Sequence, residues 1–247
     1  MPESLGGAAI PLPFDAVLFD AGGVLVVPDP VATGAALAPH GAAGDVPTLV
    51  RAHYAGMRAL DVAAAAHHGA PLEAHDWTVY RRAYATAAGV LHDRLDHAVG
   101  ALNLVWSPLL WRFPLMASVA ALWRLHRLGV PLGVVSTASG QIEGTLAAQG
   151  VCQVGRGAGV PVACVVDSHV VGVAKPDPAI FAPALVALGG PDPSRVAYVG
   201  DSVVNDVRSA EAGGLVALHL DPHDDHPEAP HRRIGSLHDL VGLLSPS

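Results

Sequence analysis

Cysteine, lysine and aromatic residues are scarce in this chain of 247 residues, and each scarcity narrows what the protein can be. With two cysteines, Cys152 and Cys164, the chain cannot be a secreted scaffold held by many disulfides, so we expect a reduced, cytoplasmic protein. A cysteine nucleophile is the alternative interpretation of these two residues. The basic residues are scattered and the formal net charge is -8, which excludes a nucleic-acid-binding surface.

The chain also lacks an uninterrupted apolar segment of the kind that spans a membrane. Residues 101–123 are apolar over a long stretch, but Asn103, Pro108, Arg112 and Pro114 interrupt it. The first residues have neither the charged nor the apolar region of a signal peptide. We therefore expect no membrane partner. We also expect the protein to be a monomer or a homodimer.

What the chain does contain is a set of short, valine-rich apolar runs that each end in polar or glycine residues. They span residues 15–21, 130–135, 163–166, 196–199 and 215–220. Helix-like stretches lie between them or after them, at 114–128, 141–149, 178–188 and 205–212. This alternation predicts an α/β fold with a doubly wound, Rossmann-like parallel sheet, which binds ligands at the carboxyl ends of its strands. That edge would carry Asp20, Ser136, Asp167, Asp201 and Asp221.

Residues 28–111 break this rhythm. Helical stretches near 46–67, 72–88 and 91–105 follow one another with no convincing strand. We predict a core domain of residues 1–27 and 112–247, with a helical domain of residues 28–111 inserted into it. Two sets of helical neighbours in the insert could line a substrate pocket, although packing of amphipathic helices gives the same pattern and is favoured. These sets are Tyr54, Arg58 and Asp61, and Trp77, Tyr80 and Arg81.

Asp20 ends the first apolar run and precedes two glycines. A carboxylate at a strand tip is exposed and held in place, which suits a nucleophile. The glycines allow backbone groups to approach a ligand closely. The alternative is that Asp20 simply forms a turn.

A second acidic segment follows the fourth run, with Asp201 at the strand end and Asp206 where a helix begins. If these two carboxylates meet Asp20 at one sheet edge, their repulsion requires a cation, and a hard ion such as Mg²⁺ suits oxygen ligands. The alternative for Asp206 is a helix N-cap.

Lys175 is the only lysine in the chain, beside thirteen arginines. Its compact charge suits the neutralisation of a phosphate or an acyl phosphate, and the alternative is a chance surface lysine. Ser136 ends the second run, where a hydroxyl and the following N–H groups can bind phosphoryl oxygens. A serine that merely terminates a strand is the alternative there.

In order and spacing, four segments resemble the four motifs of the haloacid dehalogenase-like (HAD) superfamily. They are FDAGGVL at 19–25, VVST at 134–137, KPDP at 175–178 and GDSVVND at 200–206. The insert is similar in placement to the helical cap of that superfamily's subfamily IA. The resemblance is carried by motifs in the core and is architectural only in the insert.

This resemblance implies a Mg²⁺-dependent phosphatase that acts on a small phosphorylated metabolite through an aspartyl-phosphate on Asp20. The implied magnesium ligands are Asp20, the Gly22 carbonyl, Asp201 and Asp206. The implied catalytic residues are Asp20, Ser136 and Lys175, and the implied phosphate-binding residues are Ser136, Thr137, Lys175 and Gly23.

Gly22 departs from the pattern of these phosphatases, which place a second aspartate, the general acid and base, two residues after the nucleophile. A branch of the superfamily has glycine at this position. Two alternatives stay open: a metal-independent 2-haloacid dehalogenase, and a catalytically weak member that binds a phosphorylated ligand or a protein. The dehalogenases typically differ where Asp201 stands, so the phosphatase is favoured.

Histidines are frequent, and His219, His223 and His226 suggest a metal site. The residues around them, 222–230, are rich in proline and aspartate. We therefore expect a solvated loop there.

Overall fold

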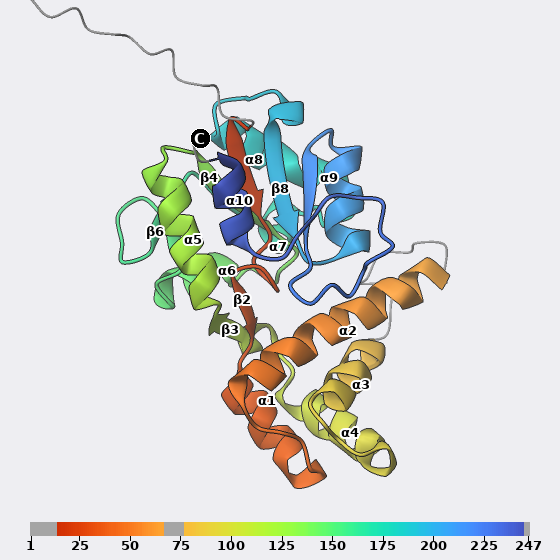
Figure 1. The fold of residues 1–247 in the computed structure, drawn as a ribbon. Helices are drawn as coiled ribbons and strands as arrows, with labels where there is room; N and C mark the ends of the chain where they lie inside the picture. Colours follow the sequence, from red (N-terminus) through yellow and green to blue (C-terminus); the bar gives the residue numbers. More distant parts are fainter. Residues whose placement is uncertain (1–13, 67–76, 245–247) are drawn as a thin grey trace, which may run out of the picture.

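The computed structural model describes residues 14–66 and 77–244. Six parallel strands form its main sheet, in the order β10-β9-β8-β1-β4-β7 (Figure 1). Their bounds are β1 (Ala16–Phe19), β4 (Leu132–Ser136), β7 (Val165–Asp167), β8 (Val196–Gly200), β9 (Val216–Leu220) and β10 (Arg233–Ile234). All five apolar runs of the sequence contribute a strand. The predicted α/β fold with a parallel sheet is therefore confirmed.

Helices cover both faces of this sheet because both faces are apolar. In β1, Val17 and Phe19 belong to one hydrophobic cluster and Leu18 to another, as the two-residue period of a strand requires. The first cluster includes side chains of α5 (Met116–Arg127), α6 (Ile142–Ala148) and α10 (Leu237–Leu244). The second includes side chains of η5 (Pro178–Phe181), α8 (Ala182–Ala187) and α9 (Arg208–Ala212).

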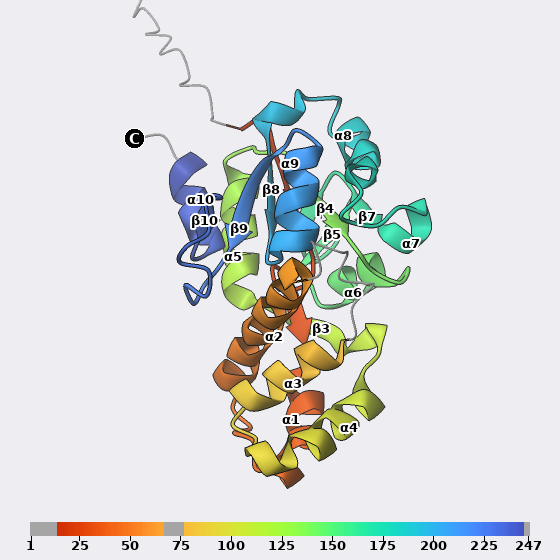
Figure 2. The same ribbon diagram turned by 90° about the vertical axis from the view of Figure 1, so that its right-hand side faces the viewer.

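Four helices form a separate layer below the carboxyl ends of the strands (Figures 1 and 2). They are α1 (Pro30–Leu37), α2 (Val46–Ala66), α3 (Thr78–Ala87) and α4 (Leu95–Val105), and we call them the insert. The insert has its own hydrophobic cluster. The chain enters it through β2 (Val26–Pro28) and leaves it through β3 (Trp111–Pro114), which pair antiparallel as one ribbon. The domain boundaries at 28 and 111 fall in this ribbon and stay a prediction.

The predicted helices of the insert correspond to α2, α3 and α4, although residues 67 and 72–76 lie outside the described part. Helix α1 was missed. Its signal was present in the sequence, since Asp29 caps the helix by accepting a hydrogen bond from the Val31 N–H, and Pro30 follows at the first helical position.

The remaining elements are short. The small sheet of β5 (Cys152–Val154) and β6 (Val160–Val162) lies outside the main sheet, and α7 (Ser168–Val171) follows β7. Single helical turns are η1 (Ala38–His40), η3 (His92–Arg94), η4 (Pro108–Leu110), η6 (Pro193–Arg195) and η7 (Val203–Val207). Among the described residues, no helix is long and apolar enough to cross a membrane.

Candidate active site

The register of the sheet brings the predicted residues to one edge. Phe19 of β1 lies beside Val134 of β4 and Val199 of β8, so the residues that follow these three positions emerge together. A cavity of about 580 Å³ lies between this edge and the insert. From the core it is lined by Asp20, Gly22, Ser136, Thr137, Lys175, Asp201 and Asp206, among others.

Three carboxylates converge in this cavity. Asp20, Asp201 and Asp206 each offer an oxygen, and these atoms lie within 4.8 Å of one another. The Lys175 ammonium lies 3.0 Å from Asp20 Oδ1 and 2.6 Å from Asp206 Oδ1. One ammonium group thus faces three buried carboxylates, and negative charge is in excess.

The pKa values report the same imbalance. Burial raises the pKa of Asp20 to about 7, while the charge of Lys175 opposes this and the charges of Asp206 and Asp201 add to it. Burial is also the main reason why the pKa of Asp201 is raised well above its usual range. A cation with a preference for oxygen ligands would relieve this repulsion. The residues present therefore fit a magnesium ion.

Lys175 is held as a buried cation. Burial alone would lower its pKa, but Asp20 and Asp206 raise it above the usual value of a lysine. Its ammonium also donates to the Tyr198 hydroxyl at 2.9 Å. Tyr198 was missed in the sequence, where it stands inside the apolar run of β8. Its hydroxyl lies 3.0 Å from both the Val135 carbonyl and Asp206 Oδ1, so it joins two strands to the site.

The structure rejects the helix-cap alternative for Asp206. The residue that caps η7, a turn of π-helix, is Ser202, whose side chain accepts from the Asn205 N–H. Asp206 lies inside that turn, and its Oδ2 accepts from the Ser202 N–H at 2.9 Å. A side chain at Gly200 would put its Cβ 2.1 Å from the Asp206 carboxyl carbon, so Gly200 is needed for this arrangement.

The structure shows a steric role for Gly23 that differs from the predicted contact with phosphate. Its N–H already donates to the Val26 carbonyl at 2.8 Å. Its φ is +68°, and an added Cβ would lie 1.8 Å from Asp201 Oδ2 and 2.6 Å from His53 Nε2. Gly23 therefore admits two other side chains to the site, since neither the turn nor the space permits a larger residue.

Gly22 lines the cavity, and an indole ring packs beside it. A Cβ at this position would lie 3.2 Å from the Trp111 ring and 4.0 Å from Asp20 Oδ2. Trp111 thus occupies the space next to the position where related phosphatases carry their general acid. Whether the Gly22 carbonyl binds a metal stays a prediction.

Ser136 and Thr137 follow one another at the end of β4, and both line the cavity. The Thr137 hydroxyl is buried and has no hydrogen-bond partner within the described residues. It can therefore donate to a ligand without breaking an existing bond. Asp167 lies beneath this loop and accepts from the Gly140 and Ile142 N–H groups, which makes it a support and not a wall of the cavity.

Helix α2 of the insert reaches the catalytic edge through His53, which was not predicted. Its Nε2 lies 2.8 Å from Asp201 Oδ2, and its Nδ1 lies 2.8 Å from the Tyr80 hydroxyl. Burial lowers the pKa of His53 to about 3, although the charge of Asp20 opposes this. A neutral imidazole that donates from Nε2 to the Asp201 carboxylate fits these contacts. A single histidine among fourteen gave no signal in the sequence.

Two further residues of α2 contact the core, and neither belongs to the described lining of the cavity, so the preference for helix packing over a pocket stands for them. The Tyr54 hydroxyl donates to the Gly23 carbonyl at 2.7 Å. The Asp61 carboxylate accepts from the Ser202 hydroxyl at 3.1 Å and from the Val203 N–H at 3.0 Å. Arg58, the third residue of that set, is exposed outside the cavity. In the other predicted set, Tyr80 is buried, but Trp77 and Arg81 line the cavity, so the preference for packing was wrong for these two.

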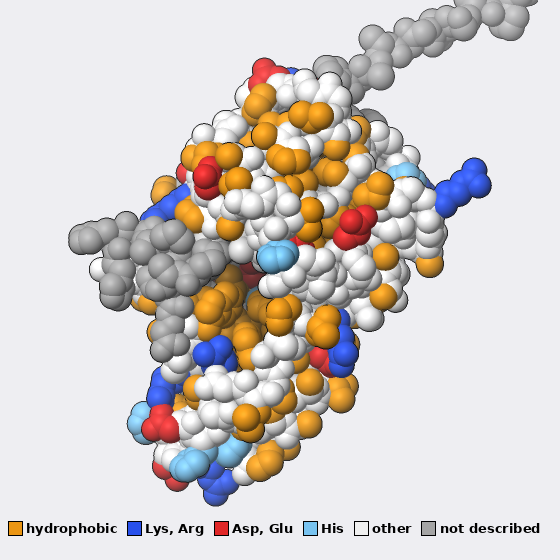
Figure 3. Space-filling model, turned by 180° about the vertical axis from the view of Figure 1, so that it is seen from behind, with side chains coloured by type: hydrophobic (Ala, Val, Ile, Leu, Met, Phe, Trp, Pro, Cys, Tyr) orange, Lys and Arg blue, Asp and Glu red, His pale blue; other side chains and the backbone are white. Residues whose placement is uncertain are grey.

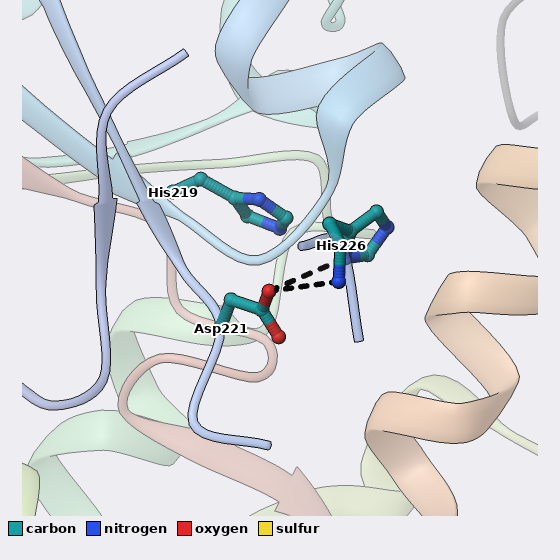
Figure 4. Close-up of side chains that lie close together, drawn as sticks. All are labelled: His219, Asp221 and His226. Atoms are coloured by element: carbon teal, nitrogen blue, oxygen red, sulfur yellow. Dashed lines mark hydrogen bonds and ion pairs between the residues drawn. The ribbon is translucent and has the colours of Figure 1, made fainter. Parts of the chain in front are cut away.

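A second group of possible ligands lies beside the site, at His219, Asp221 and His226 (Figure 4). His219 lies in β9 and Asp221 follows that strand, and both are buried. Residues 222–230 are exposed or half-buried, as expected of a solvated loop. Both ring nitrogens of His219 have partners, the His231 ring at 2.9 Å and the Asp201 carbonyl at 3.3 Å. Asp221 Oδ2 accepts from Arg233 and from the His226 N–H, each at 3.0 Å. We interpret this group as a hydrogen-bonded support for the loop that carries Asp201.

The cysteines lie away from this chemistry. Burial raises the pKa of the Cys152 thiol to about 12 and raises that of Cys164 above its usual value. Neither residue belongs to the described lining of the cavity. The alternative of a cysteine nucleophile in this cavity is therefore wrong.

Comparison with known proteins identifies the family of the chain. The family model of haloacid dehalogenase-like hydrolases matches residues 14–214. The chain is 44% identical over 80 residues to a pyrimidine 5′-nucleotidase of Escherichia coli, covering 31% of this chain and 36% of the relative. It is 40% identical over 92 residues to a phosphoserine phosphatase of Thermus thermophilus, covering 35% and 36%. The match thus spans little more than a third of either relative.

Solved structures share the fold over nearly the whole chain. A HAD phosphatase from Thermococcus onnurineus has a TM-score of 0.55 at 20% identity, covering 94% of this chain and 98% of that one. A dehalogenase has a TM-score of 0.58 at 19% identity, covering 96% and 100%. At such identities the likeness shows the fold alone, and phosphatases and dehalogenases both have it.

Proposed function

Because the chain belongs to the haloacid dehalogenase-like hydrolases, we propose that it is a magnesium-dependent phosphatase acting on a small phosphorylated metabolite through an aspartyl-phosphate on Asp20. The observation that carries this proposal is the set of three buried carboxylates around one lysine at the strand ends. The names of the two curated relatives, a nucleotidase and a phosphoserine phosphatase, support it.

The charges favour this function over a metal-independent dehalogenase. A divalent cation together with the Lys175 ammonium would match the charge of the three carboxylates. Without a cation, Asp201 and Asp206 would only add repulsion to an attack by Asp20 on a negatively charged substrate. A 2-haloacid and a phosphate monoester are both anions, so the excess of carboxylates would repel either substrate. A bound metal ion removes this repulsion, and a metal-independent enzyme has no such ion.

The residues divide the reaction between them. Asp20, Asp201, Asp206 and the Gly22 carbonyl would hold Mg²⁺, which when bound supplies neutralisation of the phosphoryl charge. One carboxylate oxygen of Asp20 attacks phosphorus, the bond to the leaving oxygen breaks, and water then cleaves the aspartyl-phosphate. Lys175 offsets the charge of Asp20 and of the transferring group. The hydroxyls of Ser136 and Thr137 donate to phosphoryl oxygens.

The glycine at position 22 limits the leaving group. A general acid usually contributes about a hundredfold to ten-thousandfold in rate, and this chain carries none at that position. Esters whose leaving oxygen needs little protonation, such as acetyl phosphate, should therefore react best. The rate should fall steeply as the pKa of the leaving alcohol rises.

The test is a substrate panel with the full-length protein: acetyl phosphate, sugar phosphates, nucleotides, phosphoserine and 2-chloropropionate, each with Mg²⁺ and with EDTA. Phosphate release that needs Mg²⁺ supports the proposal. Chloride release that EDTA leaves unchanged would establish the dehalogenase instead. No turnover, with phosphate analogues still bound, would establish the catalytically weak member. Asp20→Asn should abolish the phosphate release. Its matched control is Asp177→Asn, because Asp177 lies two residues from Lys175 but is exposed and caps η5.

A further inference from the structure

The side of the cavity that faces the insert is built from aromatic rings. Aromatic residues make up 5% of the chain and it has four tryptophans, yet Trp77, Trp106 and Trp111 all line this one cavity. They come from three separate segments: before α3, after α4 and in β3. Figure 3 shows hydrophobic side chains gathered in the recess between the core and the insert.

These rings are held in fixed positions. The Trp111 centroid lies 6.5 Å from that of Trp77 and 6.3 Å from that of Trp106, with both pairs near perpendicular. Tyr80 lies fully buried behind them and contacts all three rings, at 5.4 Å from Trp77, 5.3 Å from Trp106 and 6.4 Å from Trp111. The tryptophans themselves are only partly buried, so aromatic surface remains for a ligand.

A positive charge accompanies the rings. The Arg81 guanidinium lies 5.6 Å from the Trp106 centroid and also lines the cavity. A guanidinium is planar, stacks on rings and donates to carbonyl or anionic acceptors. This half of the cavity thus combines flat apolar surface with one strong donor group, whereas the opposite half holds the proposed phosphate site.

We propose that the three tryptophans and Arg81 form a leaving-group site for a planar aromatic ring that carries hydrogen-bond acceptors, so that the substrate class is the nucleoside monophosphates. This inference rests on the proposed phosphatase function. The leaving group of a nucleoside monophosphate is a primary alcohol, which is slow to leave without an acid at position 22, so binding of the base would have to supply part of the rate that the missing acid does not. The cavity volume is within the range of small-molecule sites. A base stacks on indole rings without needing a hydrogen bond to each atom, and its ring nitrogens or carbonyl oxygens can accept a hydrogen bond from Arg81.

The test compares substrates that differ only in the base. Adenosine 5′-monophosphate, uridine 5′-monophosphate and ribose 5-phosphate share the same primary ester, so their chemical reactivity is matched. We expect kcat/KM to be at least about tenfold higher for a nucleotide than for ribose 5-phosphate. Equal values for all three would overturn the leaving-group site.

Variants separate recognition from folding. Trp106→Ala should lower kcat/KM for the nucleotide by roughly 5- to 140-fold, as expected for one lost base–aromatic stack, while ribose 5-phosphate stays within about threefold. The matched control is Trp123→Ala, since Trp123 packs on the core and does not line the cavity. An equal loss for both substrates in Trp106→Ala would mean a structural role and overturn the proposal.

Two further measurements distinguish failure of this inference from failure of the proposed function. Acetyl phosphate has no ring, so Mg²⁺-dependent turnover of it tests the phosphatase alone. Quenching of tryptophan fluorescence by each ligand, in the presence of Mg²⁺, tests the aromatic site without turnover. Saturable quenching by a nucleotide at concentrations where ribose 5-phosphate gives none supports the site. Equal or absent quenching by both would overturn it even if acetyl phosphate is hydrolysed.

Discussion

The two ends of the cavity are built on different physical principles. At the core end, buried charges interact directly, as where the single ammonium of Lys175 contacts Asp20 and Asp206. At the insert end, partly buried tryptophans from separate segments pack on Tyr80. A charge network fails when one member is removed, because the others are left uncompensated, whereas a set of rings loses only local contact area. Substitutions at the core end should therefore lower activity toward every substrate, whereas substitutions at the insert end should lower it toward some substrates only.

The largest effect is expected at Asp20, the proposed nucleophile. Asp20→Asn should lower kcat by more than about a thousandfold for every phosphate substrate, since the carboxylate that attacks is gone. Trp106→Ala should spare acetyl phosphate. A steady-state comparison of both variants on acetyl phosphate and a nucleotide measures the contrast. An Asp20→Asn protein that keeps a tenth of its activity would remove the distinction between the two ends.

Removing the central cation should cost stability as well as activity. Lys175→Met leaves Asp20 and Asp206 buried without their counter-charge, which should lower the free energy of unfolding by about 3–5 kcal/mol. The exposed pair of Arg82 and Asp96 is the control, and Arg82→Ala should cost at most about 1 kcal/mol. Urea denaturation measures both. Equal costs would contradict the view that the core end is a closed charge network.

Magnesium should stabilise the folded protein through the same carboxylates. At a concentration one hundred times its Kd, the ion should add about 2.7 kcal/mol to the free energy of unfolding, and EDTA should reverse this. Asp201→Asn should weaken the effect, whereas Asp177→Asn should leave it unchanged. Thermal unfolding with and without Mg²⁺ measures it. A shift that persists in full in Asp201→Asn would place the ion elsewhere.

The smallest effect concerns the contact that joins the two ends. Tyr54→Phe removes the hydrogen bond to the Gly23 carbonyl, and Tyr84→Phe removes one of similar length to Thr33 inside the insert. Each should lower stability by about 0.5–1.5 kcal/mol. Only Tyr54→Phe should also change kcat/KM, and by a similar factor for all substrates, because Gly23 admits Asp201 to the site. If kcat/KM is unchanged in Tyr54→Phe, this contact has a structural role only.

Much of the core was predictable because its signals are local. Each of the five apolar runs became a strand of the sheet, and parallel strands present their carboxyl ends at one edge, so Asp20 and Asp201 had to come close. Strand β10 was missed because Arg233–Ile234 has only two residues and no recognisable run. Tyr198 was missed because an aromatic residue inside an apolar strand is no different, in sequence, from a core residue.

By itself, the sequence determined the α/β fold and the residues that meet at the carboxyl edge of its sheet, because the strand ends and the turns after them are encoded within a few residues of one another. Only the tertiary structure decided what faces that edge. His53, Trp77 and the segment that carries Trp106 and Trp111 are far apart in the chain, and packing of the insert brings them to the cavity. Gly23 is a similar case, since the atoms that exclude a side chain there belong to His53 and Asp201. Contacts between distant segments depend on how whole helices pack, and no short pattern encodes that.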